Sequence, residues 1–139
     1  MSAPLPRTWA SRKAISPAGP SEAGRKAEEA AAQWLQRRGH TILERNFLCK
    51  AGELDLVTRE GDSLVFVEVK ARTSELFGSP GEFVDARKQA KLQRAASFYL
   101  RKFGTNPPAC RFDVIEVRLA PVGQPAITHL PDAFRPGWG

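Results

Sequence analysis

Several features that would point to a particular class of protein are missing from this chain of 139 residues. It has two cysteines, Cys49 and Cys110, and no Cys-x-x-Cys pair, which excludes a disulfide framework and a cysteine-rich zinc site. We predict that both are reduced thiols of a cytoplasmic protein. No apolar run approaches the ~18 residues of a membrane span, and the N-terminal residues lack the apolar core of a secretory signal, so no membrane partner is expected.

The motifs of several enzyme classes are missing as well. The sequence has no Walker motif, no Gly-x-Gly-x-x-Gly and no Gly-x-Ser-x-Gly. Its two histidines, His40 and His129, lack the spacing of a zinc site or a catalytic triad, and we interpret both as structural. What the chain does have is an excess of positive charge, with 21 basic and 15 acidic residues and a net charge of +6. This excess favours a polyanionic partner, because basic side chains neutralise phosphates and release counterions.

Proline content and periodicity divide the chain into three parts. Residues 1–20 contain several prolines and three basic residues without an acid, a composition that predicts a flexible basic arm. Residues 21–120 carry the helical and strand patterns of a single folded domain. Residues 121–139 contain four prolines and are predicted to be a Pro-rich C-terminal tail, mostly irregular, with a short edge strand near Ala126–Leu130.

Apolar periodicity predicts six elements in the domain. Ser21 is a suitable N-cap for a first helix, apolar residues follow at helical spacing, and Gly39 provides its C-terminal stop. Alternating or continuous β-branched and aromatic residues predict strands. The predicted ranges are helices over 21–38 and 82–103 and strands over 41–48, 53–58, 64–69 and 112–117. The order αβββαβ predicts an α/β domain with a mixed sheet flanked by helices.

The second and third predicted strands are joined at Gly61-Asp62, which fits a two-residue hairpin turn. In this register Asp55 lies directly opposite Glu68, and both side chains point to the same side of the sheet. Facing carboxylates repel each other and should destabilise a sheet. A cation such as Mg²⁺ or Mn²⁺ would reverse this effect, because it binds a few carboxylate oxygens and completes its shell with water and phosphate oxygens. The pair therefore predicts a metal site.

Lys70 lies on the same side, two residues after Glu68, where it could reach a scissile phosphate or an attacking water. The same register places Glu53 opposite Lys70. An ordinary hairpin is the alternative, in which Glu53 and Lys70 form an ion pair and the two facing acids are solvated. The other side of the hairpin is predicted to be apolar, which favours the metal site, because charges in a hydrophobic strand are unusual unless they are paired or bind metal. The apolar positions are Leu54, Leu56, Val67 and Val69.

Charged residues on the two predicted helices extend this hypothesis. Glu28 lies at the edge of the apolar stripe of the first helix and is the helix acid placed to lean toward the sheet; a surface position is the alternative. The second helix has a basic face opposite its apolar face, which would suit phosphate contacts but could equally be a solvated face. The candidate nucleic-acid-binding residues are Arg72, Arg87, Lys91 and Arg94.

A set of motifs at characteristic spacing carries a resemblance to a known family. They are Gly24-x-x-x-Glu28, Arg45-Asn46, Gly52-Glu53-Leu54-Asp55-Leu56-Val57, Phe66-Val67-Glu68-Val69-Lys70-x-Arg72 and Arg111-Phe112-Asp113-Val114-Ile115. With this pattern, residues 21–134 resemble the YraN-type family of uncharacterised bacterial proteins. That family is in turn similar to the PD-(D/E)xK nuclease superfamily, and within it to Holliday junction resolvases of the archaeal type.

The resemblance implies a restriction-endonuclease-like core with Mg²⁺ or Mn²⁺ as the metal. Asp55 would be the motif aspartate, and Glu68 and Lys70 would form the E-x-K element. Glu28 would be the acid on the first helix, and the Val69 carbonyl would be an extra metal ligand. Residues 21–120 would then be a nuclease-like domain.

The leading hypothesis from these observations is a metal-dependent endonuclease that acts on structured or branched DNA in repair or recombination. DNA is favoured over RNA as the partner, and a homodimer is left open because resolvase-like enzymes act as dimers. Two alternatives belong to other classes. One is a nucleic-acid-binding module that keeps the nuclease fold without turnover, and the other is an interaction protein whose carboxylates form structural ion pairs.

Overall fold

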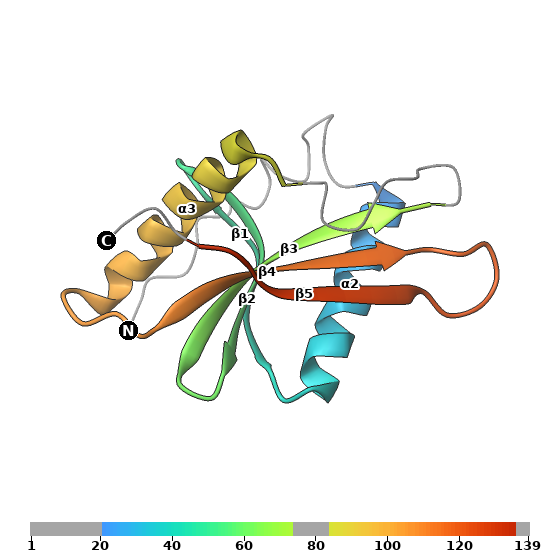
Figure 1. Ribbon diagram of the computed structural model, residues 1–139, viewed down its shortest axis with the longest axis horizontal. Coiled ribbons are helices and arrows are strands. Elements are labelled where there is room, and N and C mark those ends of the chain that lie inside the picture. The colour runs from blue at the N-terminus through green and yellow to red at the C-terminus, as the bar shows by residue number, and fades with distance from the viewer. Residues whose placement is uncertain (1–20, 74–83, 136–139) are drawn as a thin grey trace, which may run out of the picture.

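The computed structural model describes residues 21–73 and 84–135, and the predicted arm over 1–20 lies outside these ranges. Within them, two α-helices cover opposite faces of one twisted sheet of five strands (Figure 1). The elements are α2 (Glu22–Arg37), β1 (Thr41–Cys49), β2 (Gly52–Glu60), β3 (Ser63–Arg72), α3 (Ala86–Leu100), the 3₁₀ turn η1 (Arg101–Phe103), β4 (Cys110–Arg118) and β5 (Ala126–Phe134). This confirms the predicted α/β class and the order αβββαβ, which is the order expected of a restriction-endonuclease-like core, with β5 added at the edge.

The strands pair in chain order from β1 to β5. β3 and β4 run parallel, and the other neighbouring pairs in the described sheet are antiparallel. A parallel pair needs a crossover, and α3 supplies it. The carboxyl ends of β3 and β4 therefore lie side by side at one edge of the sheet, which is where ligands commonly bind in α/β proteins.

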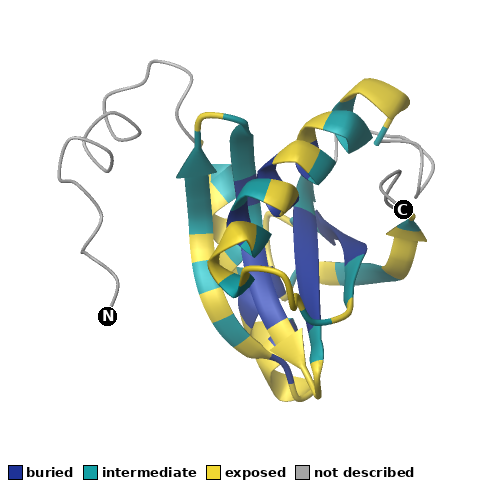
Figure 2. Cartoon of the chain, turned by 90° about the vertical axis from the view of Figure 1, so that its left-hand side faces the viewer, coloured by how far each residue is buried: buried dark blue, intermediate teal, exposed yellow. Residues whose placement is uncertain are grey.

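Each helix packs on its own hydrophobic core. Ala27 and Ala31 of α2 are fully buried in a cluster that includes Val65, and their small side chains let the helix approach the sheet closely. On the other face, the ring of Tyr99 from α3 lies edge-on to that of Phe66, with 6.0 Å between the ring centroids. Val65 and Phe66 are neighbours in β3, so the strand alternates between the two cores. The central strands are accordingly buried, whereas the outer helix surfaces are exposed (Figure 2).

The local signals in the sequence place these elements well. The Ser21 hydroxyl accepts a hydrogen bond of 3.0 Å from the Gly24 N–H and caps α2, as predicted. The hairpin turn is also confirmed, because Glu60 pairs with Ser63 and leaves two residues between them. Gly61 has a φ of +61°, the left-handed conformation that such a turn requires.

Two predicted boundaries differ from the structure. The second helix begins at Ala86, with Asp85 as its N-cap, rather than near residue 82, and residues 82–83 lie outside the described ranges. β5 runs on to Phe134 instead of ending near Leu130. Proline disfavours strands, which led us to expect a mostly irregular tail, but Pro131 is accommodated because β5 is an edge strand with an irregular register.

Candidate metal-dependent active site

Asp55 lies where β2 and β3 separate. The paired residues of the hairpin run from Glu60–Ser63 to Leu56–Val67, in the register predicted from the turn. At the next position the Asp55 carboxylate accepts a hydrogen bond of 2.9 Å from the Val69 N–H. The side-chain oxygen of Asp55 thus accepts from Val69 in place of a backbone carbonyl, and this hydrogen bond holds the carboxylate between the two strands.

Acidic side chains surround this carboxylate. Burial raises the pKa of Asp55 well above its usual value, and the negative charge of Glu68 raises the same pKa further. The hydrogen bond from Val69 opposes this shift, while Glu28 and Glu53 add to it. Three acids from α2, β2 and β3 therefore raise the pKa of Asp55 at this end of the sheet, although Asp55 is not paired with Glu68 in the β2–β3 ladder.

One detail of the predicted hairpin is wrong. Strict alternation would place Leu54 and Leu56 on the same face, but Leu54 packs in the α3 core and Leu56 in the α2 core. The alternation is interrupted at Asp55, where the carboxylate enters the ladder. This break explains how Asp55 can be influenced both by Glu68 on the α3 side and by Glu28 of α2.

The structure adds a basic residue, Lys88, that is absent from the predicted site. Lys88 of α3 forms an ion pair with Glu68, with 3.3 Å between Nζ and Oε2. The Glu68 side chain is only 7% exposed and that of Lys88 is 42% exposed. A signal was present in the sequence, because Lys88 precedes the buried Leu92 by one helical turn and so lies toward the sheet.

The other predicted residues of the site occupy different surroundings. Glu28 is half-buried, whereas Glu29 in the same turn is exposed. Lys70 is half-buried at the end of β3, and its ammonium makes no ion pair with any residue in the described ranges. The predicted alternative of a Glu53–Lys70 ion pair is therefore not what the hairpin forms.

Arg72 has a structural partner. Its Nε donates a hydrogen bond of 3.0 Å to Oε2 of Glu116, a carboxylate of β4 that is 2% exposed. Arg118 also approaches Glu116, at 3.7 Å. Lys70 is the neighbour of Glu116 across the parallel β3–β4 ladder, so Glu116 lies among three basic residues, Lys70, Arg72 and Arg118. Arg72 thus forms an ion pair with a buried carboxylate, as Lys88 of α3 also does with Glu68.

The outer face of α3 carries exposed positive charge. Arg87, Lys91 and Arg94 are all exposed, as predicted from the helical wheel. Arg94 and Arg101 also line an open cavity of about 680 Å³ beside α3, to which no acidic residue of the described ranges contributes. This surface begins one residue from Lys88 and so adjoins the carboxylate cluster.

The carboxylate cluster fits Mg²⁺ or Mn²⁺ better than it would fit a metal whose ligands are all side chains. In the described part of the chain, no three side chains of His, Cys, Asp and Glu are arranged as a metal-binding group. Mg²⁺ commonly uses one or two carboxylates and keeps water or phosphate oxygens in its remaining positions. Asp55 and Glu68 supply two carboxylates for a donor set of this kind, and the negative charge of Glu68 raises the pKa of Asp55 although Lys88 forms an ion pair with Glu68.

Asn46 marks a further irregularity next to Asp55. Its φ is +53°, and its neighbours Arg45 and Phe47 pair with Leu56 and Leu54, which places Asn46 across from Asp55. Its Oδ1 is buried and has no hydrogen-bond partner among residues 21–73 and 84–135. A left-handed conformation and an unsatisfied buried acceptor are both costly, and features of this kind gather at functional sites.

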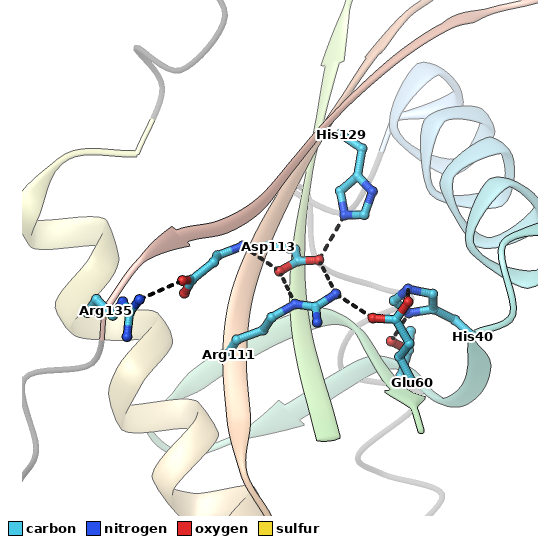
Figure 3. Close-up of polar contacts among 8 residues, drawn as sticks. His40, Glu60, Arg111, Asp113, His129 and Arg135 are labelled. Carbon is cyan, nitrogen blue, oxygen red and sulfur yellow. Dashed lines mark hydrogen bonds and ion pairs between the residues drawn. The ribbon is translucent and has the colours of Figure 1, made fainter. Parts of the chain in front are cut away.

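A second polar cluster lies away from this site and holds the edge of the sheet together (Figure 3). Asp113, which is fully buried, accepts hydrogen bonds from Arg111 at 2.9 Å and His129 at 2.8 Å. Arg111 also donates to Glu60 at 2.9 Å. His40 contacts the Thr58 hydroxyl at 2.8 Å. Both histidines are therefore parts of internal networks, as the sequence analysis predicted. The sequence signal for this cluster was an acid within the apolar run of β4.

Comparison with known proteins places the chain in a family. Its residues 27–117 match the model of a family described as uncharacterised protein family UPF0102. A UPF0102 protein of Symbiobacterium thermophilum is 46% identical over 80% of this chain and 94% of its own length. A UPF0102 protein of Hahella chejuensis is 45% identical over 80% of this chain and 88% of its own length. One of Moorella thermoacetica is 47% identical over 69% of this chain and 80% of its own length. In the ranges that the structure describes, neither helix is long and apolar enough to cross a membrane. The extent of these matches establishes that the chain belongs to the UPF0102 family.

Proposed function

We propose that this protein is a metal-dependent endonuclease that hydrolyses phosphodiester bonds of structured or branched DNA in repair or recombination. The observation that carries the proposal is the buried Asp55 with three further acids around it, and Lys70 follows Val69, the residue whose N–H donates to Asp55. The αβββαβ order and the resemblance of the D…ExK pattern to PD-(D/E)xK nucleases support the same conclusion.

Each residue has a role that follows from its position. Asp55, Glu68 and the Val69 carbonyl would hold Mg²⁺ or Mn²⁺, and the cation would polarise the phosphate and lower the pKa of a bound water. Lys70 is placed to stabilise the negative charge that develops on the phosphate or to orient the attacking water. Glu28, on the α2 side of Asp55, would orient water next to the carboxylates. Glu53 adds negative charge to the same cluster.

The basic face of α3 would position the substrate. Arg87, Lys91 and Arg94 are exposed and close in sequence to Lys88, so a nucleic-acid backbone that they contact would pass the carboxylates. Arg72 would contribute less to binding, since Glu116 already neutralises it. DNA is favoured as the partner by the resemblance to resolvases, and a homodimer would let two sites act on the two strands of a branched substrate.

Cleavage assays on labelled flap, junction and duplex DNA with Mg²⁺ or Mn²⁺ test this proposal. Lys70→Ala should lower the cleavage rate by at least ~100-fold, because removing one charge-stabilising group from an active site typically costs that much. Lys50→Ala is the matched control, since Lys50 is an exposed lysine at the β1–β2 turn. If the wild-type protein and Lys70→Ala nick all substrates at the same rate, the catalytic assignment is wrong.

A second candidate function is a nucleic-acid-binding module with the nuclease fold and no turnover. The exposed basic face of α3 favours it, because that surface does not depend on the carboxylates. Such a module would bind DNA with an affinity that falls with salt and that Asp55→Asn leaves unchanged. It would cleave none of the substrates with either metal.

A further inference from the structure

An almost fully buried carboxylate and a partly exposed lysine form an ion pair at the proposed metal site. Oε2 of Glu68 lies 3.3 Å from Nζ of Lys88, in a position from which most water is excluded. A carboxylate in such surroundings requires a compensating positive charge. When no cation is bound, Lys88 supplies that charge.

The two partners differ in their freedom to move. The Glu68 side chain is 7% exposed and is fixed by the sheet, whereas the Lys88 side chain is 42% exposed and borders solvent. The backbone of Lys88 is held in place, because its N–H donates a hydrogen bond of 2.9 Å to the Asp85 N-cap. Only the flexible side chain of Lys88 would need to move for the ion pair to open.

We infer that Lys88 is an exchangeable counter-ion of Glu68, which leaves the carboxylate when a divalent cation binds and then contacts a phosphate of the nucleic acid. This inference rests on the proposed function, since it uses the same metal and substrate. An ammonium and a divalent cation repel each other at one carboxylate, so the binding of either cation weakens the binding of the other. Two exposed cations of α3, Arg87 and Lys91, flank Lys88 and mark where the phosphates would lie.

Calorimetric titration of the full chain with Mn²⁺ at pH 8 tests the first half of the inference. Lys88→Met keeps a long, helix-compatible side chain but removes the charge. It should bind Mn²⁺ about tenfold more tightly than the wild-type protein, because an opposite charge next to a carboxylate typically changes its proton affinity by that factor or more. Lys91→Met, one turn further along the exposed face, should stay within about twofold of wild type. Lys88→Arg retains the cation and should not bind Mn²⁺ more tightly.

Fluorescence anisotropy with a labelled DNA duplex in Ca²⁺, a cation with a similar preference for oxygen ligands, tests the second half. Here Lys88→Met should weaken binding roughly threefold or more, because one phosphate contact is lost. The variant would thus bind the cation more tightly and the nucleic acid more weakly. A lysine with a merely structural role would weaken both, so the opposite signs identify the exchange.

The outcomes separate this inference from the proposed function. Equal Mn²⁺ affinities for the wild-type protein and Lys88→Met would overturn the counter-ion role and leave the metal site in place. Absence of Mn²⁺ binding in both, or binding that Asp55→Asn does not remove, would overturn the proposed function and the inference with it. Unchanged DNA affinity in Lys88→Met would overturn the phosphate contact. If Lys88→Met does not fold, Lys88→Gln provides the same comparisons.

Discussion

Two aspartate side chains of this sheet accept hydrogen bonds from backbone N–H groups, which in a regular ladder would donate to backbone carbonyls. Asp55 accepts from the Val69 N–H and Asp113 from the Asp132 N–H, each at 2.9 Å. The β2–β3 pairing ends just before Asp55, and the β4–β5 register shifts at Asp113. Burial raises the pKa of each carboxyl group. At Asp113, hydrogen bonds from His129 and Arg111 outweigh that effect and lower the pKa, whereas at Asp55 nearby acids raise it further. Asp113 therefore has its negative charge compensated within the fold, whereas the groups around Asp55 add further negative charge.

His40 gives a residue-scale prediction about pH. The pKa of its imidazole is lowered, mainly because the ring is buried. The positive charges of Arg111 and His129 lower this pKa further, while the negative charges of Glu60 and Asp113 only partly offset the shift. The unfolded chain therefore takes up this proton more readily than the folded one. The stabilising contribution of neutral His40 is present above about pH 6.5 and is lost as the pH falls through the lowered folded-state pKa.

Urea unfolding between pH 8 and pH 5 measures this effect. As the pH falls across that range, the free energy of unfolding of the wild-type protein should decrease relative to that of His40→Gln. Asp55, whose raised pKa gives the opposite pH dependence, is present in both proteins. Asp113, whose pKa is lowered, contributes its pH dependence only at more acidic values, below about 3.9. Identical slopes would show that His40 is not the titrating group.

At the scale of elements, the hairpin β2–β3 could be predicted in most of its detail. Two-residue turns restrict the register, and Gly61 at positive φ fits that turn, so the pairing of the strands followed from the sequence. The limit of the prediction is Asp55, where strict alternation fails. Side-chain period alone cannot reveal that a carboxylate will enter the ladder, because this depends on how far β3 and β2 separate.

The edge strand β5 gives an element-scale prediction. Asp113→Ala should lower the free energy of unfolding by about 3–5 kcal/mol, because it leaves Arg111 and His129 without the buried carboxylate that pairs with both. Glu29→Ala is a matched control, since Glu29 and Arg45 form an exposed ion pair of the same 2.9 Å length and its loss should cost about 0–1 kcal/mol. Chemical denaturation gives both values. Equal small losses would mean that β5 is held by packing alone.

At the scale of the whole molecule, the sequence identified the groups on one hairpin but not the partners that arrive from elsewhere. Asp55, Glu68 and Lys70 lie within one pair of strands, so a turn sufficed to bring them together. Lys88 and Glu116 join them only because α3 crosses over the sheet and β4 pairs with β3 in parallel. Such partners are set by the packing of distant elements, which spacing along the chain does not encode.

The distribution of charge over the molecule gives the last prediction. The net charge is +6, but exposed cations lie on both helices, so overall charge alone would attract DNA to either face. If α3 is the binding face, replacing Arg87, Lys91 and Arg94 together by Gln should reduce the slope of log affinity against log salt concentration by about 3, one unit for each phosphate contact. The matched control replaces three exposed cations of α2 by Gln, at Arg25, Lys26 and Arg37, and should change the slope by less than about 1. Anisotropy titrations with labelled duplex at several salt concentrations measure both slopes. Equal changes in the two triple variants would mean that DNA is attracted by the overall charge, and the orientation that brings a phosphate to Lys70 would lose its support.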